Sequence, residues 1–284
     1  MKISIYHLFV LAALFMFSCS DDSSSAPAPP TSTDPGDTQP SGNNDVLVWS
    51  DEFDYEGLPD SDNWIIETGN GDWGWGNGES QYYLEDNINV SNGTLKIHVK
   101  KEDKSGFQYT SGRLKTQYGY SFKYGRVDVR AKLPSNQGTW PAIWMLGNTH
   151  SSVGWPRCGE VDIMEQTGAN KNKILATAHW FNGNGTSSNP NRPNPTSVNI
   201  GAGEIAIQNV STQFHTYSLE WTDTHIKMLL DNVEYFSMPT NSSQPFDKKF
   251  FFLLNVAVGG TLGGSVPSNF PDDVMEVDYI RVYQ

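Results

Sequence analysis

Residues 155–168 read Trp-Pro-Arg-Cys-Gly-Glu-Val-Asp-Ile-Met-Glu-Gln-Thr-Gly and place three carboxylates, Glu160, Asp162 and Glu165, close together in the chain. In a regular strand Glu160 and Asp162 share one face, whereas Glu165 points to the other. One extra residue, forming a β-bulge, brings Glu165 back beside its neighbours. The stretch therefore predicts a bulged strand with three carboxylates crowded on one face.

Crowded carboxylates repel one another, so at least one of the three is expected to hold a proton near neutral pH. This arrangement costs the fold stability but suits acid–base chemistry. The alternative is a solvated acidic strand, and the spacing alone leaves both interpretations open.

The sequence on both sides of this stretch has a period of two rather than 3.6, which is typical of half-buried strands. One further run is almost continuously apolar, as in a fully buried strand, and Asn-Gly pairs mark turns between runs. We see no convincing amphipathic helix, so the sequence predicts an all-β sandwich or jelly roll. The alternating runs are 95–99, 126–133, 217–221 and 226–230, the apolar run is 250–258, and the turns are at 92–93 and 182–183.

The composition excludes several classes of protein. The 284 residues carry a net charge of −13, which disfavours nucleic-acid binding because that requires clustered Lys and Arg. Two cysteines cannot form a disulfide scaffold, and no pair of histidines has zinc-binding spacing. Nine tryptophans indicate aromatic binding surfaces instead.

The N-terminus is predicted to direct export. Residues 1–18 resemble a lipoprotein signal peptide, since a basic start and an apolar run end in a small residue directly before Cys19. Lipidation of Cys19 would anchor the protein in a membrane. The stretch Cys-Ser-Asp-Asp at 19–22 resembles the export signal of Bacteroidetes surface lipoproteins, so we expect the anchor in the outer membrane, with the protein at the cell surface. The alternative is a plain cleaved signal. Residues 19–45, rich in Ser, Pro and Asp, predict a disordered tether, and residues 46–284 a single, monomeric domain.

Glu-Val-Asp-Ile-Met-Glu at 160–165 resembles the signature of glycoside hydrolase family 16 in its laminarinase-like form. Other segments agree and occur in the order typical of the family, so the resemblance covers essentially all of residues 46–284. These segments are Asp-Glu-Phe-Asp at 51–54, Phe-Lys-Tyr-Gly-Arg at 122–126, Gly-Thr-Trp-Pro-Ala-Ile-Trp-Met at 138–145 and Val-Asp-Tyr-Ile-Arg-Val-Tyr at 277–283.

The resemblance implies a concanavalin A-like jelly roll of two curved antiparallel sheets with a concave substrate cleft. It implies retaining hydrolysis by double displacement, with Glu160 as nucleophile, Glu165 as acid/base and Asp162 assisting. Catalysis by two carboxylates needs no cofactor.

The resemblance also implies a set of sugar contacts, in which indole rings stack on pyranose faces and polar groups fix the hydroxyls. Trp140 and Trp144 match positions around the cleavage point, while Arg113, Asn77 and Glu79 match ligands on the non-reducing side. The family's usual Asn-Asn-Glu reads Asn-Gly-Glu here, which leaves one sugar contact in doubt. Further candidates are His179 near the acid/base and Trp73, Trp75, Trp155 and Trp180 as platforms, whereas Trp49, Trp64 and Trp221 are expected in the core.

A structural Ca²⁺ is the one metal that the resemblance implies, through Glu52, the Gly93 carbonyl and Asp278. Alternatively, these carboxylates bond to backbone amides. Cys158 is expected to be a small packed residue.

The expected substrate is a neutral β-glucan, because an acidic domain disfavours sulfated galactans. The signature favours endo-acting hydrolysis of β-1,3-glucan (laminarin), with mixed-linkage β-1,3-1,4-glucan close behind and the loop at 182–197 as the expected determinant of specificity. An agarase-like activity and a non-catalytic surface glycan-binding lipoprotein stay open as alternatives, although binding alone has no need of the carboxylate cluster.

Overall fold

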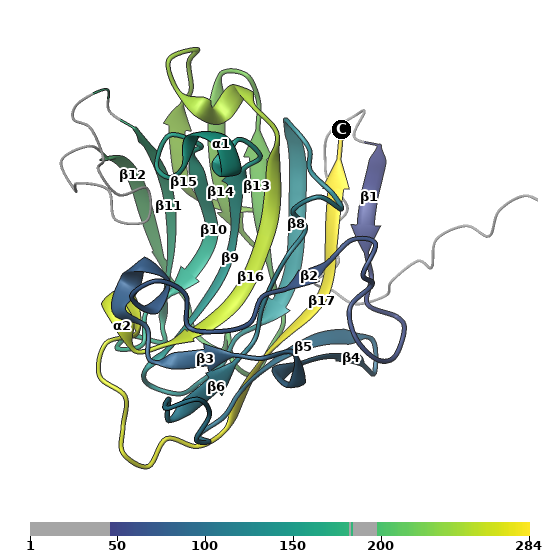
Figure 1. Cartoon of the computed structure of the whole chain (residues 1–284). Helices are drawn as coiled ribbons and strands as arrows, with labels where there is room; N and C mark the ends of the chain where they lie inside the picture. Colours follow the sequence, from purple (N-terminus) through teal and green to yellow (C-terminus); the bar gives the residue numbers. More distant parts are fainter. Residues whose placement is uncertain (1–45, 182, 184–197) are drawn as a thin grey trace, which may run out of the picture. The chain divides into compact units, whose positions relative to one another are not determined.

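The computed structural model describes residues 46–181, 183 and 198–284. In this part of the chain the strands form two large antiparallel sheets and one parallel pair, β3 (Gln81–Tyr83) with β6 (Tyr109–Ser111) (Figure 1). Sheet A runs in the order β15 (Val233–Pro239), β14 (His225–Leu230), β13 (His215–Trp221), β8 (Gly125–Lys132), β17 (Asp273–Tyr283), β5 (Thr94–Val99) and β4 (Ile88–Ser91), with β1 (Leu47–Asp51) also on β17. Sheet B runs in the order β12 (Val198–Ala206), β11 (Lys173–Phe181), β10 (Glu160–Gln166), β9 (Thr139–Gly147), β16 (Phe250–Val258), β7 (Arg113–Lys115) and β2 (Ile65–Ile66).

The helices among the described residues are short and lie in the connections. They are η1 (Gly74–Gly78), η2 (Glu85–Asn87), α1 (His150–Val153), η4 (Pro245–Asp247) and α2 (Gly260–Gly263). Within the described residues, no helix has the length and apolarity that a membrane crossing requires.

The hydrophobic core lies between the two sheets. Val127 and Val129 of β8 belong to the same buried cluster as Ile143 and Met145 of β9, so alternate residues of both sheets meet in one core. All nine residues of β16 are buried, as the continuous apolar run predicted. The expected strands and the antiparallel sandwich are therefore confirmed, as are core positions for Trp64 and Trp221.

The predicted β-bulge lies in β10. Towards β9, Asp162 pairs with Trp144 and Met164 with Ile143, so two steps on β10 match one step on its neighbour. The pairing with β11 shifts in the same interval. Ile163 and Met164 both enter the core as a result, and Glu165 returns to the face of Asp162.

Candidate active site

The three carboxylates lie on the face of sheet B turned away from the core, which we call the active-site face. The register aligns residues of this face in rows across the strands, so that side chains far apart in the sequence become neighbours. The first row reads Phe251, Leu146, Glu160, His179 and Ile200; the second reads Leu253, Trp144, Asp162, Thr177 and Ala202; the third reads Arg113, Asn255, Ala142, Glu165, Leu175 and Glu204.

His179 lies against two of the carboxylates. Its Nε2 atom is 3.2 Å from Asp162 Oδ2 and 3.7 Å from Glu160 Oε1. Burial alone would lower the pKa of His179, but the hydrogen bond to Asp162 and the charges of Glu160 and Asp162 raise the pKa to about 9. The imidazole is therefore protonated at neutral pH, and it contacts the carboxylates of β10 more closely than the sequence suggested.

Glu165 is held by two donors. The indole N–H of Trp140 donates to Oε1 at 2.9 Å, and the Thr177 hydroxyl donates to Oε2 at 3.2 Å. Trp140 is buried, so its hydrogen bond fixes the direction of the carboxyl group on the strand. These contacts orient the Glu165 carboxyl group, but both donors are uncharged and do not neutralise it.

The pKa values of all three carboxyl groups are raised, which agrees with the predicted retention of a proton. Burial is the main cause in each case. The charges of Glu160 and Glu165 raise the pKa of Asp162 further, to well above its usual value. Protonated His179 opposes the shift at Glu160, whereas the Trp140 hydrogen bond opposes it at Glu165.

Arg113 forms the centre of a second cluster on the same face. Its guanidinium carbon lies 4.3 Å from the centroid of the Trp75 ring and 5.0 Å from that of the Trp144 ring. Glu67 accepts a hydrogen bond from Arg113 Nε at 2.6 Å and one from Lys115 at 2.5 Å. Cation–π contacts and an ion pair together hold the guanidinium in one orientation.

Glu79 belongs to a buried hydrogen-bond network beside this cluster. Its carboxylate accepts from Asn77 at 3.1 Å, from Gln81 at 2.7 Å and from the Tyr83 hydroxyl at 3.0 Å. The network continues from Tyr83 to the active-site face through Asn255. Its Nδ2 donates to the Tyr83 hydroxyl at 3.2 Å, and its Oδ1 accepts from the Trp144 indole N–H at 2.8 Å. The predicted contacts on the non-reducing side thus form one connected group with Arg113.

The structure adds site residues that the sequence did not reveal, namely Glu67, Tyr83, Thr177 and Asn255. Asn255 had a readable signal, since it is the one polar residue in the apolar run of β16. Glu67 had none, because the pairing of β2 with β7 brings it beside Arg113 and Lys115.

Two tryptophans differ in their environments. Trp155 packs beside the site, with its ring centroid 6.0 Å from that of His179. Trp180 instead packs against the core, edge-on to Phe246, so its expected role as a sugar platform is wrong. The reason is strand alternation, since Trp180 follows His179 directly and points to the opposite face. Cys158 is fully buried beside Leu146, as predicted.

The carboxylates expected to bind Ca²⁺ are paired with arginines in this structure. Glu52 accepts from Arg281 at 2.9 Å, and Asp278 accepts from Arg130. Because each carboxylate is already neutralised by a guanidinium group, Glu52, Asp278 and the Gly93 carbonyl do not form a preformed calcium site. Calcium binding stays a prediction. The expected lipidation site, Cys19, lies outside the described residues, as does the loop at 182–197 apart from Gly183.

An antiparallel β-sandwich that carries two glutamates and an aspartate on a bulged strand, flanked by indole rings, is the architecture of a polysaccharide-cleaving glycoside hydrolase. Comparison with known proteins agrees, since residues 74–281 match the model for glycosyl hydrolases family 16. The beta-glucanase of Rhodothermus marinus is 40% identical over 84% of this chain and 85% of its own length. The crystal structure of the laminarinase from the same organism superposes with a TM-score of 0.74 at 40% identity, covering 85% of this chain and 98% of that one.

A variant of LamA from Zobellia galactanivorans, solved in complex with laminaritriose and laminaritetraose, has a TM-score of 0.74 at 40% identity, covering 84% of this chain and 99% of that one. The match to the family model and the extent of these likenesses identify the chain. It belongs to glycoside hydrolase family 16.

Proposed function

We propose that this protein is an endo-acting β-glucan hydrolase that cleaves β-1,3-glucan, with mixed-linkage β-1,3-1,4-glucan as the runner-up substrate. The observation that carries the proposal is the shared face of Glu160, Asp162 and Glu165, on which Trp140 orients Glu165 and His179 faces Glu160. The names of the relatives, a beta-glucanase and a laminarinase, support the substrate class.

In this proposal the reaction retains configuration and proceeds in two displacements. Glu160 acts as the nucleophile, because positively charged His179 favours its ionised form, and it attacks the anomeric carbon. Glu165 holds a proton on its buried carboxyl and passes it to the departing glycosidic oxygen. In the second displacement, Glu165 takes a proton from water, and the water oxygen replaces Glu160 on the sugar.

Asp162 and His179 are assigned to control of protonation. Asp162 forms an ion pair with His179 and keeps the imidazole charged at neutral pH, and this charge in turn favours ionised Glu160. Sugar binding on the non-reducing side is assigned to Arg113, Asn77 and Glu79, with Trp144 and Trp155 beside the cleavage point.

We also propose that the protein works as a monomer anchored to the outer membrane through lipidated Cys19, with residues 19–45 as a tether and residues 46–284 as the catalytic domain. Metabolic labelling with a fatty acid tests the anchor, since Cys19→Ala should abolish incorporation. Label retained in Cys19→Ala, or absent from the unaltered protein, would contradict it.

The proposed reaction is tested by reducing-sugar release from laminarin, curdlan, barley mixed-linkage glucan and agarose. We expect the highest rate on laminarin and a loss of at least about a thousandfold in Glu160→Gln with folding intact. A higher rate on barley glucan would favour the runner-up, and release from agarose would indicate galactan hydrolysis. Binding without release from any glucan would make the protein a glycan-binding lipoprotein.

A further inference from the structure

On the active-site face, the strand next to His179 is β12, and its residues on this face are mostly aliphatic. In the register of β11 with β12, His179 pairs with Ile200, Thr177 with Ala202 and Phe181 with Val198. Directly opposed residues point to the same face with Cβ atoms roughly 4.5–5.5 Å apart. Ile200 therefore lies beside His179, in the same row as Glu160, and two strand spacings place it roughly 9–10 Å from that glutamate.

Ile200 is exposed although it borders the catalytic residues. Its exposed fraction is 61%, the side chain is β-branched and apolar, and β12 is one of the two edge strands of sheet B among the described residues. An exposed apolar residue on an edge strand invites unwanted pairing with other chains, so its exposure here favours a role in binding.

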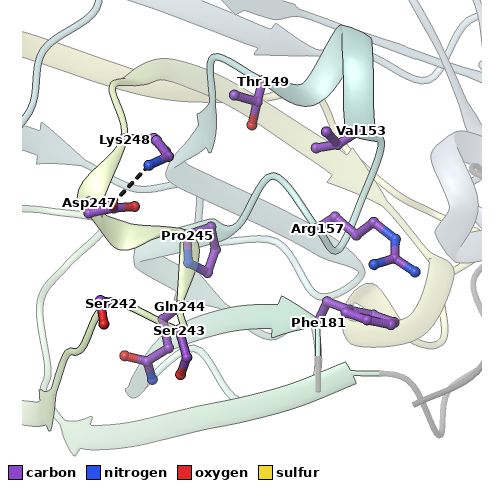
Figure 2. Close-up of a pocket in the computed structure, with 10 residues that line it drawn as sticks. All are labelled: Thr149, Val153, Arg157, Phe181, Ser242, Ser243, Gln244, Pro245, Asp247 and Lys248. Atoms are coloured by element: carbon purple, nitrogen blue, oxygen red, sulfur yellow. Dashed lines mark hydrogen bonds and ion pairs between the residues drawn. The ribbon is translucent and has the colours of Figure 1, made fainter. Parts of the chain in front are cut away.

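The neighbours of Ile200 on this face are also aliphatic. Val198 and Ala202 flank it on β12, and together the three form a surface that we call the aliphatic floor. Arg157 marks one end of the floor, where its guanidinium carbon lies 3.6 Å from the centroid of the Phe181 ring (Figure 2). An ion pair between Lys173 and Glu204 marks the other end.

The two sides of the catalytic carboxylates therefore offer different chemistry. On the side of β7 and β16, Arg113 and Asn255 present a guanidinium and an amide group. On the side of β12 the floor presents aliphatic C–H groups, which contact the apolar face of a pyranose ring but form no directed hydrogen bonds with its hydroxyls.

We propose that the aliphatic floor binds the leaving-group sugars of the β-glucan and tolerates either a β-1,3 or a β-1,4 linkage between them, with Ile200 as the main contact. The inference rests on the proposed function, which places the non-reducing side at Arg113. Selectivity for linkage then belongs to the Arg113 side, where hydrogen bonds depend on the position of each hydroxyl.

The test uses two glucose tetrasaccharides that differ only in the linkage between the two sugars at the reducing end, β-1,3 in one and β-1,4 in the other. For the unaltered protein we expect kcat/KM values for release of the terminal disaccharide that agree within about threefold. Ile200→Ser should lower both values by about three- to tenfold, and Ile200→Trp should raise both, because a larger apolar surface is offered to the same ring.

Val233→Ser is the matched control, because Val233 is 57% exposed on β15, which lies at one end of sheet A in the described part of the chain. It should change neither value. Thermal unfolding of each variant reports folding, and Ile200→Trp tests the contact independently if Ile200→Ser is unstable.

A preference above tenfold for one linkage in the unaltered protein, or Ile200 variants that behave like Val233→Ser, would overturn the inference while hydrolysis itself remained. Failure to cleave either tetrasaccharide or laminarin would instead overturn the proposed function, and the inference with it.

Discussion

Nε2 of His179 lies 3.2 Å from Oδ2 of Asp162, although the two residues are far apart in the chain. The pairing of β10 with β11 brings them together, since Asp162 is opposite Thr177 and Glu160 is opposite His179. One imidazolium thus faces two carboxylates on the catalytic strand. This relationship links the charge of a histidine to the protonation of the proposed nucleophile, and it leads to the first prediction.

Replacing His179 with Asn should shift the acid limb of the pH profile to higher pH. Protonated His179 lowers the pKa of Glu160 against the effect of burial, so removing its charge lets that pKa rise. We expect kcat/KM at pH 5–6 to fall by about tenfold or more, since a pKa change of one unit is tenfold in the ionised fraction. His215→Asn is the control, because His215 pairs with Asp231 on sheet A. An unshifted acid limb in His179→Asn would refute the link.

Trp140→Phe should alter the other limb of the profile. The Trp140 indole donates to Glu165 and lowers the pKa of that carboxyl, so its loss should let the pKa rise and move the basic limb to higher pH. We expect a fall of about ten- to a hundredfold in kcat, because Glu165, the proposed acid/base, also loses its orientation. Trp221→Phe removes a comparable N–H, donated to the Phe246 carbonyl in the core, and should reduce thermal stability without moving either limb. Equal profiles for the two variants would contradict the assignment.

Asp162→Asn should make the protein more stable and less active. Burial and the charges of Glu160 and Glu165 raise the native-state pKa of Asp162, so its stabilising contribution is complete below the unfolded-state value of about 3.8 and is lost as pH rises through the native value. At pH 8 the unaltered protein bears the free-energy cost of a buried carboxyl group crowded by two others. The neutral amide in the variant removes this cost. We expect Tm at pH 8 to rise by roughly 2–4 °C, with little gain at pH 4. A Tm that falls at both pH values would show that the carboxyl group is stabilising.

The sequence was sufficient for the sheets and the catalytic strand because strand alternation and carboxylate spacing are local patterns. Glu165 comes three residues after Asp162, so the two share a face only if the strand holds one extra residue. This spacing predicted the bulge, and the register confirms it. Contacts that depend on which strands become neighbours were beyond reach. Trp180 illustrates the limit. Its aromatic side chain suggested a sugar platform, but it follows His179 on the strand, so it points to the opposite face and packs against the core.

The final prediction concerns Glu67, which lies on the loop after β2 and contacts Arg113 and Lys115. Its pKa is lowered, because the two cations outweigh the effect of burial, so the carboxylate is ionised across the working range of the enzyme. Glu67→Gln keeps the shape but removes the charge, and the guanidinium between Trp75 and Trp144 loses its fixed orientation. Since Arg113 is proposed to bind sugar away from the reacting bond, we expect KM to rise by about tenfold and kcat to change by less than about threefold. Glu220→Gln, which removes a comparable contact with Arg126 on sheet A, should leave both constants unchanged. A loss confined to kcat would contradict a role in substrate binding. A loss of Tm with unchanged kinetics would mean that Glu67 serves only to neutralise buried Arg113 and partly buried Lys115.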